Sequence, residues 1–329
     1  MVSISPLSER LRPTQAPRRR RRTRAGLVVL AALATALLVG CGSSGGGDGK
    51  ASDGKVDVVA GFYPLAWMAE QVGGDRVAVT NLTKPGAEPH DLELTPRDVA
   101  AVTDADLAVH LAGVQPAVDD AIASSGVRAF DAARSAKLDR TYTPLEGGEV
   151  AQDEANSRDP HFWLDPTRMA AVADAFADEL GKADPDHAAT YEANARQLRS
   201  QLEALDRELA SGLADCDSKI IATSHNAFGY FAERYGLRQE AIAGVSPEAE
   251  PTPAQLAAIS RFVERNGVST IYAETLVDPS AAEAVAKETG AKVAVLDPIE
   301  GVTDRSAAKD YPGLLRADLR ALRSGLGCS

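Results

Sequence analysis

Residues that bind metals or act as nucleophiles are scarce in this chain, because its 329 residues include only five histidines and three cysteines. The sequence has no Cys-x-x-Cys pair and no His-Glu-x-x-His run. These two absences argue against a local cysteine site for zinc and against the helical signature of a zinc hydrolase. A metal site here would have to be assembled from residues that are far apart in the sequence.

A long hydrophobic run is also missing. The apolar stretch from Ala25 to Gly40 follows the arginine-rich tract Arg18 to Arg24 and is shorter than the ~20 residues of a spanning helix. This pattern predicts a signal peptide over residues 1–40. The segment "LVGC", ending at Cys41, resembles the lipobox of bacterial lipoproteins, which implies cleavage before Cys41 and a lipid on its sulfur. The alternative is an uncleaved anchor helix.

Positive charge is in short supply beyond the signal peptide. Without residues 1–40 the chain has 27 basic and 46 acidic residues, a net charge of −19. This balance argues against nucleic acid as a partner and is compatible with a cationic ligand. The small residues of 41–54 predict a flexible tether between the lipid and the folded part.

Two cysteines remain once Cys41 is assigned to the lipid. They are Cys216 and Cys328. In an exported protein a pair of thiols tends to be oxidised, so we predict a disulfide between them.

Short β-branched runs alternate with helical patterns from Val56 to the segment "VRAFD", and the alternation returns after Cys216. This is typical of open, mostly parallel sheets covered by helices. We therefore predict an α/β protein with two lobes, an N-terminal lobe over 55–182 and a C-terminal lobe over 214–329. Thr95-Pro96 and Thr252-Pro253 predict helix starts, with the threonine as the N-cap.

A long helix is predicted over 183–213, between the two lobes. Tyr191, Leu198, Leu205 and Leu213 belong to an apolar series spaced by threes and fours, and no glycine or proline interrupts residues 186–211. Its length and position favour a rigid strut joining both lobes over an ordinary surface helix within one lobe.

Four side chains lie at strand ends or in connections that lead into helices. They are His90, His161 in "DPHFWLDP", His225 and Asp297. Such connections gather at the carboxyl ends of parallel strands, so two facing lobes would bring the four together. Three imidazoles and a carboxylate suit a tetrahedral zinc ion, although spacing alone does not prove a shared site.

Several segments together resemble the cluster A-I family of solute-binding proteins, which serve zinc and manganese ABC importers. These segments are "PGAEPHDLELTP", "DPHFWLDP", "TSHNAFGYFAERYG", "SPEAEPTP" and "VLDPIEG", in this order around the long helix. The resemblance implies two lobes joined by a rigid helix, a metal between them, and His90, His161, His225 and Asp297 as its ligands. Glu274, at the end of "TIYAE", is expected to accept a hydrogen bond from a ligand imidazole, and the alternative is that it substitutes for a ligand.

The resemblance implies a monomeric, lipid-anchored receptor on the outer face of the cell membrane that delivers Zn²⁺ to an ABC permease, and not an enzyme. The alternatives are a manganese receptor of the same family, a metal-dependent adhesin or an exported zinc hydrolase. Histidine at position 225 favours zinc over manganese, which prefers oxygen ligands. We expect metal affinity to fall on acidification, as the imidazoles begin to bind protons near pH ~6.5.

The sequence also departs from the family. Many zinc importers carry a histidine-rich loop between the first two ligands, whereas the acidic segment from Pro144 to Asp159 contains no histidine. An accessory zinc-binding loop is therefore not expected. His110, His187 and the two tryptophans, Trp67 and Trp163, are expected to have structural roles.

Overall fold

A computed structural model describes residues 54–142, 157–247 and 250–329. The predicted signal peptide, Cys41, nearly all of the tether and most of the histidine-free segment lie outside these ranges. Within them, no helix combines the length and the apolar composition needed to cross a membrane.

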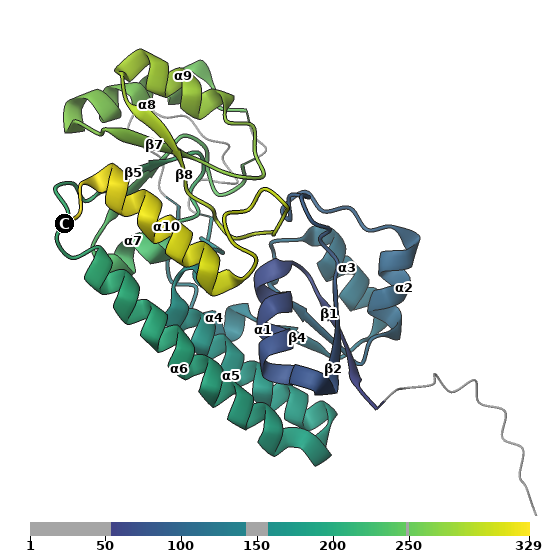
Figure 1. The fold of residues 1–329 in the computed structure, drawn as a ribbon. Helices are drawn as coiled ribbons and strands as arrows, with labels where there is room; N and C mark the ends of the chain where they lie inside the picture. Colours follow the sequence, from purple (N-terminus) through teal and green to yellow (C-terminus); the bar gives the residue numbers. More distant parts are fainter. Residues whose placement is uncertain (1–53, 143–156, 248–249) are drawn as a thin grey trace, which may run out of the picture. The chain divides into compact units, whose positions relative to one another are not determined.

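The described residues form two four-stranded parallel sheets (Figure 1). The N-terminal sheet has the order β2-β1-β3-β4 and consists of β1 (Val56–Ala60), β2 (Val77–Asn81), β3 (Leu107–His110) and β4 (Ala129–Asp131). The C-terminal sheet has the order β6-β5-β7-β8 and consists of β5 (Ile220–Thr223), β6 (Arg238–Ala241), β7 (Thr270–Ala273) and β8 (Lys292–Val295). Both orders reverse direction beside their first strand, which places a ligand crevice at the carboxyl ends of the strands.

Helices cover both sheets. They are α1 (Tyr63–Gly73), α2 (Pro96–Asp104), α3 (Pro116–Ser125), α4 (Ala133–Ala136), α5 (Pro166–Ala183), α6 (Ala188–Gly212), α7 (Gly229–Tyr235), α8 (Pro253–Asn266), α9 (Ser280–Thr289) and α10 (Tyr311–Leu326), with short 3₁₀ turns at Gly74–Arg76, Phe162–Leu164 and Pro185–His187. Thr95 and Thr252 form the predicted capping boxes at the starts of α2 and α8. The predicted fold class, two α/β lobes joined by a long helix, is confirmed; the exact lobe boundaries stay predictions.

The long helix α6 has 25 residues and is therefore about 37 Å long. Its apolar series from Tyr191 to Leu209 is buried, and α6 packs on α5 and α1 of the N-terminal lobe and on α10 of the C-terminal lobe. Asp206 pairs with Arg234 of α7, and Glu208 pairs with Arg316 of α10. The helix is thus fixed to both lobes along its length.

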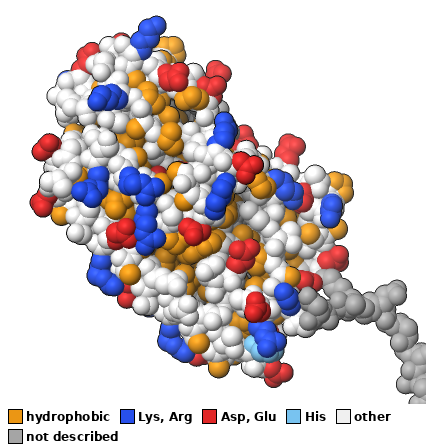
Figure 2. Space-filling model, in the orientation of Figure 1, with side chains coloured by type: hydrophobic (Ala, Val, Ile, Leu, Met, Phe, Trp, Pro, Cys, Tyr) orange, Lys and Arg blue, Asp and Glu red, His pale blue; other side chains and the backbone are white. Residues whose placement is uncertain are grey.

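The largest hydrophobic cluster runs through both lobes without a break. It includes Val58 of β1, Leu202 of α6, Phe231 of α7 and Leu315 of α10. Smaller clusters lie on the other face of each sheet. On the face shown in Figure 2, basic and acidic side chains are intermingled and form no large basic patch.

Cys216 and Cys328 are joined by a disulfide, as predicted. The bond links the segment before β5 to the chain end after α10. Backbone hydrogen bonds from Ser218 to Leu326 and from Ser329 to Asp215 accompany it. The C-terminal tail is therefore held against the start of the C-terminal lobe.

Candidate metal site

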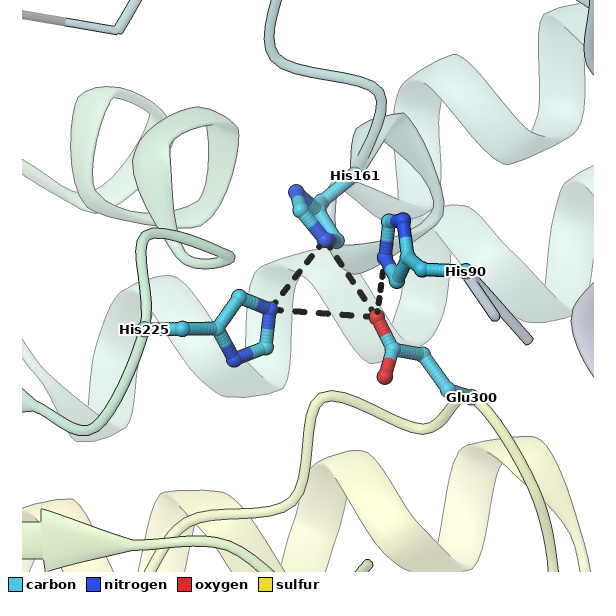
Figure 3. A group of neighbouring side chains, drawn as sticks. All are labelled: His90, His161, His225 and Glu300. Carbon is cyan, nitrogen blue, oxygen red and sulfur yellow. Dashed lines mark hydrogen bonds and ion pairs between the residues drawn. The ribbon is translucent and has the colours of Figure 1, made fainter. Parts of the chain in front are cut away.

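Three of the four predicted ligands meet between the lobes, and a different carboxylate joins them (Figure 3). His90 follows β2, His161 precedes the turn that leads into α5, and His225 follows β5. The fourth member is Glu300, in the loop after β8. We call His90, His161, His225 and Glu300 the His₃Glu site.

The four ligand atoms of the His₃Glu site all lie within 4.8 Å of one another. Oε1 of Glu300 lies 3.3 Å from Nε2 of His161, 3.4 Å from Nε2 of His90 and 3.9 Å from Nε2 of His225. The Nε2 atoms of His161 and His225 are 3.3 Å apart. A tetrahedron with metal–nitrogen bonds of ~2.0–2.1 Å has edges of about 3.3–3.4 Å. Three of these spacings match the edges of the tetrahedron, and the one from Glu300 to His225 would have to shorten by about 0.5 Å.

The opposite nitrogen of two rings is held by a carboxylate. Nδ1 of His161 lies 2.9 Å from Oδ1 of Asp159, and Nδ1 of His225 lies 2.7 Å from Oε2 of Glu274. Each carboxylate accepts a hydrogen bond from Nδ1–H, which fixes the tautomer that leaves the lone pair on Nε2, and Nε2 faces the centre of the site. Glu274 thus occupies the supporting position expected for it.

Burial and charge oppose each other at His161. Burial by itself lowers its pKa, but hydrogen bonds and charge from Asp159 and Glu300 outweigh burial and raise the pKa to about 9. Burial would raise the pKa of Glu300, yet hydrogen bonds from His161 and His90, with the positive charge of the rings, hold it well below its usual range. The carboxylates in and around the site therefore stabilise positive charge there.

The second carboxylate oxygen of Glu300 lacks a hydrogen-bond partner among the described residues. This atom, Oε2, is buried. A buried carboxylate oxygen without a partner is costly, and a cation beside Oε1 would offset part of that cost. His90 is the most exposed side chain of the four, and a cavity of about 440 Å³ opens beside it.

Asp297 lies outside the His₃Glu site, which differs from the sequence-based expectation. Its Oδ1 accepts the N–H of Ile299 at 2.8 Å, and its Oδ2 accepts the hydroxyl of Thr275 at 3.2 Å. Ile299 has a φ of 60°, an unusual value for a β-branched residue. The carboxylate of Asp297 thus supports a strained turn, and the turn carries Glu300 to the histidines.

Trp163 fixes the same turn from the other lobe, because its indole Nε1 donates to the carbonyl of Pro298 at 2.7 Å. Trp67 stacks on Tyr311. The remaining two histidines lie outside the site: His110 is bonded to Asp119, and His187 is bonded to Asp184.

A family profile described as zinc-uptake complex component A, periplasmic (ZnuA) matches residues 58–325. The chain is 34% identical over 304 residues to the zinc-binding lipoprotein AdcA of Streptococcus pneumoniae, covering 90% of this chain and 60% of that protein. It is 32% identical over 318 residues to the high-affinity zinc uptake system protein ZnuA of Bacillus subtilis, covering 92% and 97%. The chain therefore spans only about three fifths of AdcA but nearly all of that ZnuA.

Among solved structures, the chain is similar to the laminin-binding protein Lmb of Streptococcus agalactiae, described as bifunctional with adhesin and metal transporting activity. The TM-score is 0.71 at 36% identity, and the match covers 82% of this chain and 99% of Lmb.

Proposed function

The chain belongs to the zinc-uptake complex component A (ZnuA) family, and from this premise we propose that it is an extracytoplasmic receptor that binds Zn²⁺ and delivers it to an ABC permease. One observation carries the choice of ligand. Three imidazole nitrogens and one carboxylate oxygen converge in a buried site with spacings close to the edges of a zinc tetrahedron.

The donor set favours a receptor for zinc over the other roles considered. Manganese prefers oxygen ligands and higher coordination, whereas three of the four donors here are nitrogen. A catalytic zinc keeps a position open for water, whereas the His₃Glu site supplies four protein groups. We therefore do not propose a hydrolase.

Export and anchoring belong to the same proposal. Residues 1–40 are proposed to direct secretion, and Cys41 is proposed to carry the lipid that holds a monomeric receptor at the membrane. The support is the sequence before Cys41, together with the description of AdcA as a lipoprotein. Mass spectrometry of the membrane-extracted protein tests this, since an unmodified Cys41 would contradict it.

The decisive test is zinc uptake. A strain that lacks the gene should grow poorly in zinc-chelated medium, and the wild-type gene should restore growth. Elemental analysis of the protein, purified without a histidine tag, should find about one zinc per chain. A protein that bound no zinc would refute the proposal.

Adhesion is a second candidate, supported by the likeness to Lmb. Binding of the purified protein to immobilised laminin would favour that role. The result would be clearest for a strain whose zinc uptake does not depend on this gene.

Glu300 and Asp297 can be distinguished by substitution. Glu300→Gln should lower zinc affinity at least about tenfold more than Asp297→Asn, because it neutralises the carboxylate at the site centre. The asparagine in the second variant keeps a side-chain oxygen that can accept the N–H of Ile299. Competitive titration against a chromogenic chelator measures both variants, and the opposite order would return Asp297 to the ligand set.

Zinc binding should release protons above neutral pH. With a pKa of about 9, His161 is protonated in the metal-free protein at pH 7.5, and zinc must displace the proton from Nε2. About one proton should be released from His161, and His225 adds to this number because its pKa is also raised: burial lowers it, but Glu274 more than compensates. Calorimetry in buffers with different protonation enthalpies gives this number.

The sign of the pH dependence follows. Apparent zinc affinity should rise with pH until about 9, so competition with protons begins well above the ordinary value of 6.5. By the same linkage, His161 stabilises the metal-free fold fully below pH 6.5, and this stabilisation is lost as the pH rises through about 9. Zinc binding at pH 7.5 without proton release would contradict the charged state of His161.

A further inference from the structure

A second cavity, of about 710 Å³, lies in the C-terminal lobe beyond the ends of β7 and β8. Its walls are the loop from Glu274 to Pro279, the end of β8, the loop around Arg305 and one turn of α10. Its lining includes Glu274, Asp278, Val295, Asp297, Arg305 and Asp318. We call this cavity the acidic pocket.

Carboxylates dominate the charge of the acidic pocket. Four of its lining residues are acidic and only Arg305 is basic. Glu274, Asp297 and Asp318 are each more than nine-tenths buried. Because buried charges are weakly screened, this lining favours a cation.

Asp318 has a vacant acceptor. Its Oδ1 accepts the N–H of Asp297 at 2.8 Å, whereas its buried Oδ2 has no hydrogen-bond partner among the described residues. Burial raises the pKa of Asp318 well above its usual range and that of Asp297 to about 6, and the nearby charge of Arg320 does not offset the burial of Asp318. A ligand with N–H donors would supply the missing hydrogen bond to Oδ2 of Asp318.

A single metal ion does not suit the pocket. In the described part of the chain, the His₃Glu site is the one group of three or more histidine, cysteine or acidic residues whose ligand atoms lie close enough to share an ion. The acidic pocket also has apolar walls formed by Leu276, Val277 and Val295. Val295 is half-exposed, and it is one of only three large hydrophobic residues exposed in the described ranges.

Apolar walls around carboxylates match a cationic head on an aliphatic stem. We propose that the acidic pocket binds an alkylammonium or alkylguanidinium group. Such a group occurs on free amines and on the lysine or arginine side chains of a protein partner, and the experiment below distinguishes these two sources.

Glu274 links the acidic pocket to the His₃Glu site, and this part of the inference rests on the proposed function. The same carboxylate lines the pocket and holds Nδ1 of His225. A cation in the pocket competes for Glu274, and zinc in the His₃Glu site repels that cation. The two ligands therefore weaken each other's binding, and by linkage they do so by the same factor.

The first test uses n-butylguanidinium and its neutral analogue n-butylurea, titrated calorimetrically into the metal-free, full-length protein. We expect saturable binding of the cation at one site and none of the urea. Equal binding of both probes, or of neither, would overturn the proposal. Because no metal is present, this result is independent of whether the protein binds zinc.

Two surface variants locate the binding. Val295→Lys places a tethered ammonium at the pocket and should abolish binding of the probe. Arg305→Ala removes the one basic residue of the lining and should raise affinity by up to about fivefold, the upper range for interactions between exposed charges. Neither residue belongs to the His₃Glu site, but through Glu274 the tethered ammonium of Val295→Lys should lower zinc affinity, whereas Arg305→Ala should leave it unchanged or slightly raised. Probe binding that both variants left unchanged would place the cation elsewhere.

The source is distinguished by the peptide acetyl-Ala-Arg-Ala-amide and its citrulline counterpart. Binding of the arginine peptide but not the citrulline peptide identifies a protein side chain, whereas binding of n-butylguanidinium alone identifies a free amine. Repeating the titration with zinc-loaded protein tests the link, since equal affinity in both states would refute coupling through Glu274.

Discussion

Replacing His161 with alanine is expected to lower zinc affinity by roughly 10²–10³-fold. Four protein ligands share a binding free energy of ~10–16 kcal/mol in structural zinc sites, which is about 2.5–4 kcal/mol for each ligand. Each 1.4 kcal/mol corresponds to a factor of ten. His161 is completely buried and central to the site, so no neighbouring group can easily take its place. Competitive titration against a chelator of known affinity measures the change.

His110→Ala is the matched control, because this histidine is also buried and also bonded to a carboxylate, yet lies outside the His₃Glu site. Its zinc affinity should stay within a few-fold of wild type. Circular dichroism of both variants separates loss of ligand from loss of fold. A folded His161→Ala protein with unchanged affinity would exclude the His₃Glu site as the zinc site.

Removing the disulfide is expected to lower the free energy of unfolding by about 4–5 kcal/mol. Cys216 and Cys328 are 112 residues apart, and the loop-entropy model assigns this amount to so long a closed loop. The double variant Cys216→Ser/Cys328→Ser should therefore unfold at a much lower denaturant concentration than the oxidised wild type. Chelator is kept in excess so that bound metal does not contribute to stability.

Wild-type protein treated with a reductant is the control for this experiment, since it breaks the same link without changing the sequence. It should unfold close to the double serine variant. A decrease in the free energy of unfolding below about 1 kcal/mol would contradict the prediction. It would mean that the unfolded chain is already compact, or that hydrogen bonds, and not the disulfide, mainly hold the C-terminal tail in place.

Most of the fold could be predicted because its signals are local. The runs around β1, β3, β5 and β7 are apolar and β-branched, and the helix starts carry threonine and proline in the right order. The strand β6 gives no such signal, because its sequence, Arg238 to Ala241, is polar and partly exposed at a sheet edge. An edge strand takes its conformation from its neighbour, so its own residues give little signal.

The candidate site was predicted in three of its four members. The histidines are rare, and each lies where the fold gathers its loops. The choice between Asp297 and Glu300 depends on the turn at Ile299, whose positive φ directs the glutamate inward. Neither spacing nor propensity indicates a left-handed isoleucine, because that conformation is stabilised by burial of its side chain and by the bond to Asp297.

The unbroken hydrophobic cluster has a consequence for how the protein can move. Separating the lobes widely would bring side chains such as Leu202 and Phe231 into contact with water, at about 25 cal/mol for each Å² of apolar surface. The two lobes are therefore expected to move together as one rigid body. Opening of the metal site is therefore expected to involve small movements of loops such as the one that carries His90, and not separation of the lobes.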